Sequence, residues 1–138
     1  MKKFKKILTL IVIITVVAIF AAGCSKKTDN GCELVVSSGT ATLTVTQEGK
    51  NNKVFTCATT GGTLEEILNE IVEKTDFTFD YDTYPTGIFI TKICDIESSF
   101  SEETWFAIYI GEEMSVQGAS ELNIEDGIIY KIVLVKGW

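Results

Sequence analysis

The chain has 138 residues, enough for one domain with its own core, and a formal net charge of −7. It contains no histidine and no arginine, which excludes Ser-His-Asp and Cys-His catalytic pairs and removes the bidentate group that recognises phosphate. An acidic chain is repelled by nucleic acid, so the composition excludes nucleic-acid binding and argues against an enzyme.

The start of the chain is typical of a secretory signal. Four lysines open it, residues 7–22 form an apolar run, and small residues stand just before Cys24. Small residues followed at once by cysteine resemble the lipobox of bacterial lipoproteins, in which the cysteine receives a diacylglycerol and becomes the first residue of the mature protein. We therefore expect a signal peptide over residues 1–23 and lipidation at Cys24.

Lipidation would hold the protein on the extracytoplasmic face of the cell membrane, because two acyl chains give stable anchoring where one does not. The alternative is an uncleaved membrane anchor, although the apolar run is short for a span of about 20 residues. Residues 24–36 are then expected to form a polar, lipid-anchored tether. Without the four lysines of the signal, the whole-chain charge of −7 becomes −11.

The mature region opens with a predicted hairpin and a helix. Residues 40–46 alternate threonine with small or apolar residues, and residues 53–58 return as a second strand after a turn. Thr63 and Glu66 then form a capping box, in which a hydroxyl and a carboxylate each bind a free backbone N–H. Apolar residues recur at helical spacing and predict one buried stripe: Leu64, Ile67, Leu68, Ile71 and Val72.

The rest of the chain predicts further strands, over residues 77–82, 87–93, 104–110 and 128–135. One amphipathic helix cannot cover two sheets, so it is expected on one face of one sheet. The predicted fold class is α+β, β-grasp-like, with one helix packed on a mixed or antiparallel sheet that contains β-hairpins.

Three cysteines remain in the mature region, Cys32, Cys57 and Cys94. A disulfide is permitted outside the cell, but three is an odd number, so at most one intramolecular bridge forms. The sequence leaves the pairing open and equally allows three reduced thiols.

The acidic residues do not predict a metal site. Asp76, Asp80 and Asp82 could suggest calcium, which binds carboxylate oxygens. No Asp-x-Asp-x-Asp-Gly loop is present, and Asp80 and Asp82 simply alternate along a strand. We expect solvated acids here, with no metal ligand, no catalytic residue and no required cofactor.

Four stretches in fixed order resemble one known domain. They are residues 62–68, 77–79 and 87–93, and the region from Trp105 to Trp138. Their order and spacing are similar to the C-terminal domain of transcobalamin and intrinsic factor, which also occurs alone in bacterial surface lipoproteins. The resemblance covers nearly the whole mature chain and implies such a domain over residues 37–138.

In transcobalamin and intrinsic factor this domain closes over the upper face of cobalamin, largely with backbone and apolar groups. The resemblance therefore implies a ligand site in this chain. It would be made by the start of the strand at Gly87, by Ala107 on the strand that contains Trp105, and by the hairpin region at residues 114–118. The matching positions are Gly87, Ile88, Phe89, Ala107, Met114, Ser115, Val116, Gln117 and Gly118.

The leading hypothesis is a membrane-anchored, extracytoplasmic lipoprotein that binds cobalamin or another corrinoid for a membrane importer. The alternative is a cell-surface protein-interaction or cell-wall-associated module without a small-molecule ligand, which would use a sheet edge or an aromatic patch. A concave apolar hollow between the strand at Gly87 and the hairpin at residues 114–118 would favour the first. A flat patch or an unpaired edge strand would favour the second.

Overall fold

The computed structural model describes residues 30–137, so the predicted signal peptide and Cys24 lie outside the described residues. These residues form two sheets and one helix, and every pair of neighbouring strands is antiparallel. The larger sheet has six strands in the order β3 (Lys53–Ala58), β2 (Thr40–Thr46), β1 (Gly31–Ser37), β9 (Ile129–Lys136), β7 (Thr104–Ile110) and β8 (Glu113–Met114). The smaller sheet has β4 (Phe79–Tyr84), β5 (Gly87–Ile93) and β6 (Ile96–Glu97), and the helix is α2 (Leu64–Lys74).

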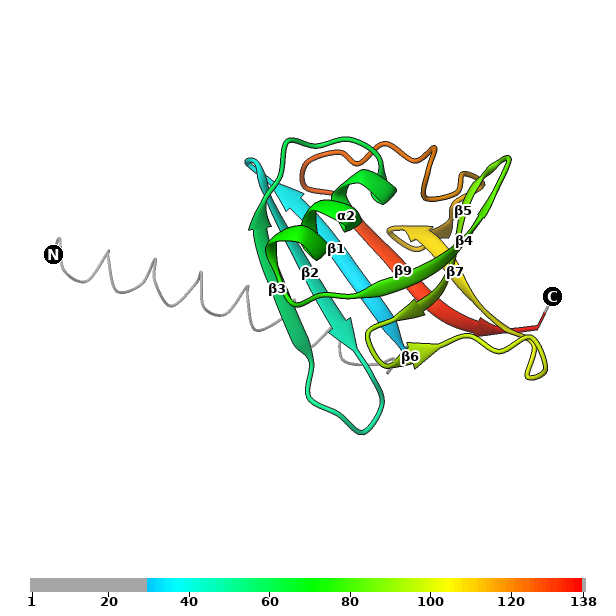
Figure 1. The fold of residues 1–138 in the computed structure, drawn as a ribbon. Coiled ribbons are helices and arrows are strands. Elements are labelled where there is room, and N and C mark those ends of the chain that lie inside the picture. The colour runs from blue at the N-terminus through cyan, green and yellow to red at the C-terminus, as the bar shows by residue number, and fades with distance from the viewer. Residues whose placement is uncertain (1–29, 138) are drawn as a thin grey trace, which may run out of the picture.

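The helix and the smaller sheet lie on the same side of the larger sheet (Figure 1). The predicted α+β fold with hairpins and a single amphipathic helix is confirmed in the described part of the chain. Two details differ from the expectation: the pairing there is antiparallel throughout, and the small sheet is separate from the large one. No helix of residues 30–137 is long and apolar enough to span a membrane.

Strand β2 forms because its residues alternate between two environments. Ala41, Leu43 and Val45 point into the core and are nearly inaccessible, whereas the threonines between them face the other side of the sheet. The strand pairs with β3 as predicted, with Leu43 opposite Phe55. Threonine is β-branched and suits a half-exposed strand position.

Helix α2 begins where predicted, and the hydroxyl half of the predicted capping box is present: Thr63 accepts a hydrogen bond from the backbone N–H of Glu66 at 3.3 Å. It ends where Thr75 leaves helical geometry and its backbone N–H binds the carbonyl of Ile71. Four of the five stripe residues are buried, but Val72 is 37% exposed. The stripe is therefore narrower than the spacing indicated.

Strand β1 corrects the predicted tether and domain boundary. Residues 24–36 were expected to be a tether before a domain at residues 37–138, yet β1 starts at Gly31 and lies between β2 and β9. Cys32, Leu34 and Val36 are buried in the core. The polar residues before Gly31 suggested a linker, and the pairing of β1 with β9 joins segments far apart in sequence, which local pattern does not indicate.

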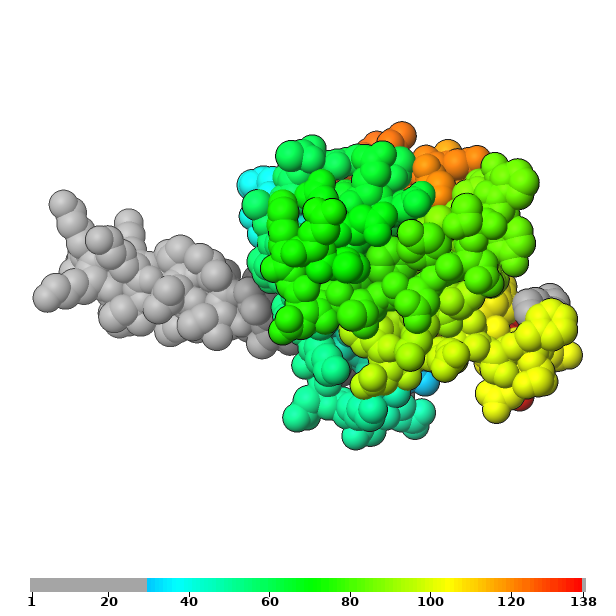
Figure 2. All heavy atoms as spheres, viewed as in Figure 1, coloured from blue at the N-terminus to red at the C-terminus, as the bar shows by residue number. Residues whose placement is uncertain are grey.

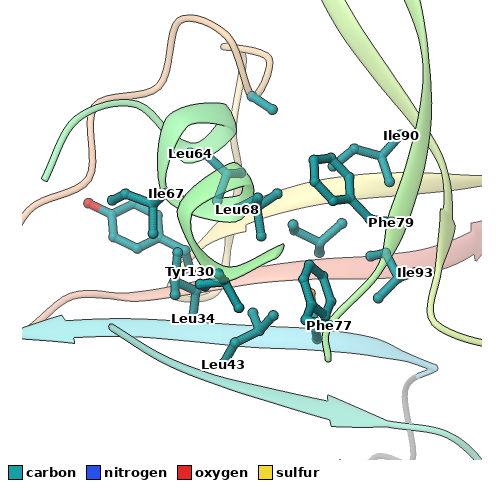
Figure 3. Close-up of a cluster of buried hydrophobic side chains, with 14 of the residues drawn as sticks. Leu34, Leu43, Leu64, Ile67, Leu68, Phe77, Phe79, Ile90, Ile93 and Tyr130 are labelled. Atoms are coloured by element: carbon teal, nitrogen blue, oxygen red, sulfur yellow. The ribbon is translucent and has the colours of Figure 1, made fainter. Parts of the chain in front are cut away.

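The core lies between the helix, the large sheet and the small sheet (Figure 3). In Figure 3, helix residues Leu64 and Leu68 point toward the large sheet, and Phe79 and Ile93 approach from the small one. An aromatic series runs outward from the core, with ring-centre distances of 5.4 Å for Phe55–Phe77, 5.9 Å for Phe77–Phe79 and 5.3 Å for Phe79–Tyr81. These contacts fix the small sheet over the core.

Candidate ligand-binding surface

The start of β5 is tied to the segment that follows Gly118. The backbone N–H of Ile88 donates to Ser120 Oγ at 3.0 Å, and the Ser120 hydroxyl donates to a carboxylate oxygen of Glu65 on α2. Gly87 has a φ of 127°, and a Cβ atom there would lie 2.7 Å from Ser120 Oγ. Only glycine fits this position without displacement. The two hydrogen bonds hold the β4–β5 hairpin against the Ser120 segment and, through Ser120, connect it to α2.

Hydrogen bonds also hold the turn after β8 in place. Ser115 donates its backbone N–H to the carbonyl of Ile108 at 2.7 Å, and its hydroxyl bonds both to the carbonyl and to the backbone N–H of Gln117. Val116, between these two residues, is fully exposed. The turn therefore presents an apolar side chain to solvent on an ordered backbone.

Of the other predicted site residues, Ala107 lies apart from this region. Ala107 is almost inaccessible, and because Phe106 beside it points into the core, Ala107 faces the opposite side of the large sheet. Phe89 is exposed on the outer side of the small sheet, opposite Asp82. The fold thus bonds the start of β5 to the segment that follows residues 114–118, and it turns Ala107 to the far face of the large sheet. Phe89 lies on the same side of the small sheet as Tyr84.

We call Tyr84, Met114 and Val116 the apolar rim. Tyr84 is 54% exposed at the end of β4, Met114 is 52% exposed on β8, and Val116 is fully exposed. The β4–β5 hairpin, which carries Tyr84, is bonded through Ile88 to Ser120, four residues after Val116. Figure 2 shows the green tip of the β4–β5 hairpin beside the orange segment that follows β8.

No deep hollow accompanies the rim among the best-defined depressions of residues 30–137. One depression, of about 600 Å³, is lined by Ser101, Glu102, Glu103, Thr104 and Lys136. Another holds only about 20 Å³ and is lined by residues of the β2–β3 and β5–β6 turns, Cys94 among them. Neither depression lies between Gly87 and residues 114–118, where a concave apolar hollow would favour a corrinoid ligand.

The sequence did not indicate Ser120. Its role depends on Ile88 and Glu65, which are distant in the chain and meet it only in the folded domain. No spacing or motif marks a single serine as such a junction. Leu122 and Ala119, the buried residues on either side, were the only local sign that this segment is ordered.

No group of three or more Cys, Asp or Glu side chains within residues 30–137 is arranged to hold a metal ion. No polar or charged residue of this region is classed as buried. That the protein has no enzymatic activity and binds no metal ion stays a prediction.

No disulfide joins the three cysteines of the domain, Cys32, Cys57 and Cys94, in this structure. Burial raises the pKa of the Cys32 thiol well above its ordinary value, and the neighbouring Cys94 raises it further. A hydrogen bond with the backbone of Ile132 acts in the opposite direction, and Glu33 adds a smaller upward effect. Cys32 is thus a protonated core residue, 5% exposed.

Comparison with known proteins supports the fold and a family. The family model described as "Domain of unknown function (DUF4430)" matches residues 61–130, about half of the chain. A solved structure from Ruminococcus gnavus ATCC 29149, described as a candidate metal-binding protein, has a TM-score of 0.55 and 24% identity, and the match covers 66% of this chain and 90% of that one. At this identity the likeness shows the fold alone. No curated protein matches this chain.

Proposed function

The chain belongs to the DUF4430 family, and we propose that it is a membrane-anchored, extracytoplasmic ligand-binding lipoprotein whose binding surface is the apolar rim. The observation that carries this proposal is the full exposure of Val116 on a turn held by three hydrogen bonds. Covering an exposed, ordered apolar side chain with a ligand contributes favourable free energy of binding, at roughly 25 cal/mol per Å² of apolar surface buried.

The proposed ligand is cobalamin or another corrinoid. This choice rests on the resemblance to the cobalamin-covering domain of transcobalamin and intrinsic factor. The rim offers exposed apolar side chains on an ordered turn, so the surface has the apolar part of the chemistry that such a lid uses. A rim of exposed side chains covers one face of a ligand and leaves the other face in water, so we expect a modest affinity.

The metal-binding description of the Ruminococcus gnavus protein does not guide the choice of ligand for this chain. Residues 30–137 hold no cluster of acidic and cysteine side chains suited to a metal ion. A corrinoid carries its own metal within the macrocycle and needs no such cluster from the protein.

The test is a calorimetric titration of the full chain, extracted in detergent, with cobalamin and with cobinamide. We expect saturable binding with a Kd in the micromolar range, weakened about tenfold by Val116→Ser because the substitution removes apolar contact area. Val54→Ser is the matched control, since Val54 is 61% exposed on β3 and lies far from the rim. Heat absent up to millimolar corrinoid would exclude this ligand class.

A second candidate function is docking of a surface protein on the edge of β3. Strand β3 pairs with β2 on one side, and no described strand pairs with its other side. An open edge can accept an extended peptide as a further strand. Loss of partner capture with Val54→Pro, and unchanged capture with Val116→Ser, would favour docking over corrinoid binding.

A further inference from the structure

Two of the three thiols come together where the two sheets meet. Cys32 lies on the inner face of β1, directly opposite Val45 of β2. Cys94 follows β5 and lines the same small depression as Val45. Both cysteines also contact the same hydrophobic core. Side chains directly opposite in an antiparallel pair have Cβ atoms about 5 Å apart, so Val45 places Cys94 close to Cys32.

The electrostatics agree with this placement. Cys94 is one of the groups that raise the pKa of Cys32, so the two thiols lie within range of each other. The turn that carries Cys94 is itself fixed to the large sheet, because Asp95 forms ion pairs with Lys50 at 3.6 Å and Lys53 at 3.9 Å. The backbone N–H of Cys94 also binds the carbonyl of Thr78.

Cys57 lies too far from Cys32 to form a bridge with it. Cys57 stands opposite Ala41, whereas Cys32 stands opposite Val45, four positions along β2. At ~3.3 Å per residue the offset along the strands is ~13 Å, beyond the ~7 Å between Cα atoms that a disulfide allows. Lys53, which shares the depression with Cys94, is likewise four positions from Cys57 on β3.

We propose that Cys32 and Cys94 form a disulfide that joins β1 of the large sheet to the β5–β6 turn of the small sheet, leaving Cys57 as a free thiol. The oxidant is a disulfide-bearing molecule that reaches the protein outside the cell. Cys94 is partly exposed and Cys32 is buried, so Cys94 reacts first. The inference concerns the scaffold and does not depend on which ligand the apolar rim binds.

The reaction is a thiol–disulfide exchange in two steps. The Cys94 thiolate attacks one sulfur of the oxidant, the oxidant's S–S bond breaks, and one small thiol leaves. Cys32 gives its proton to water and attacks Sγ of Cys94, which releases the second small thiol. Two protein thiols lose two electrons and two protons, and one disulfide of the oxidant becomes two thiols.

The experiment treats the full chain with glutathione disulfide, alkylates free thiols and digests the protein with trypsin. Lysines at positions 26, 50, 53, 74 and 92 place the four cysteines of the chain in four separate peptides. Mass spectrometry then reads the pairing directly. We expect the peptide of Cys32 joined to that of Cys94, and the peptide of Cys57 alkylated.

Variants make the outcome decisive. Cys57→Ala should form the same bridge and show the same rise of several degrees in Tm on oxidation, because a long closed loop restricts the unfolded chain. Cys94→Ala should show neither, while far-ultraviolet circular dichroism confirms that it folds. A bridge that includes Cys57, or a folded wild-type chain with all thiols alkylated after oxidation, would overturn the proposal.

Discussion

Gly87 is the residue on which the junction between β5 and the Ser120 segment depends. Its φ of 127° lies in a region that side chains rarely adopt, and a Cβ would come within 2.8 Å of two Ser120 atoms. We expect Gly87→Ala to lower the free energy of unfolding by about 1–3 kcal/mol. Urea denaturation measures this.

Gly118→Ala is the matched control for that prediction. Gly118 lies in the same segment, has no unusual φ, and no atom lies within 4 Å of a Cβ placed there. Its effect should stay within about 0.5 kcal/mol. Equal effects of the two substitutions would show that the contact with Ser120 does not constrain the hairpin.

Cys32 should make the domain sensitive to alkaline pH when reduced. Its folded pKa is raised above the ordinary value of 9.0, so the unfolded chain loses a proton first as the pH rises. The contribution of the Cys32 thiol to the free energy of unfolding is therefore fully present below about pH 9. Above that pH it falls by up to about 1.4 kcal/mol per pH unit.

The measurement is urea denaturation from pH 8 to pH 10.5 under reducing conditions, with Cys32→Ala and Cys57→Ala compared. Other groups titrate in this range, so the comparison is between slopes. Cys57→Ala should keep the wild-type slope and Cys32→Ala should flatten it. A common slope in all three proteins would contradict the buried, protonated state of Cys32.

The N-terminus of α2 is capped by the side chain of Thr63. Thr63 Oγ1 accepts the Glu66 N–H, so Thr63→Ala should lower the free energy of unfolding by about 1 kcal/mol. Thr63→Ser keeps the hydroxyl and should lose much less. Thermal denaturation compares them, and equal losses would assign the effect of Thr63 to its methyl group instead.

The same element shows what local pattern can predict. The bounds of α2 followed from a capping residue and a periodic stripe, both of which act within a few residues. The β2–β3 hairpin followed from alternation and a turn for the same reason. Strand β1 did not follow from local pattern. Its partner β9 is far away in the sequence, and the place of β1 inside the sheet comes from this tertiary pairing.

The fold brings only part of the expected site residues together. Gly87, Ile88 and residues 114–118 do lie on neighbouring segments, joined by a serine that no motif marks. Ala107 was drawn into the set by its place after Trp105, but strand alternation turns it to the far side of the sheet. One residue along a strand decides the face, and a resemblance of spacing does not carry that precision.

At the scale of the whole molecule, the anchoring hypothesis makes a prediction about residues before Gly31. The mature protein should begin at Cys24 and carry a diacylglycerol, so cells given labelled palmitate should label the wild type. Cys24→Ser should remove the label, and Cys57→Ser should keep it. Membrane association of an unlabelled wild type would instead support an uncleaved apolar anchor.

Amide chemical-shift mapping by NMR, during a titration with cobinamide, shows whether a corrinoid binds at the apolar rim. We expect saturable shifts at Tyr84, Ile88 and residues 114–118, with β3 unchanged. Shifts confined to residues 53–58, or no shift up to millimolar cobinamide, would rule out corrinoid binding at the rim. Docking of a partner at the open edge of the large sheet would then be the remaining hypothesis.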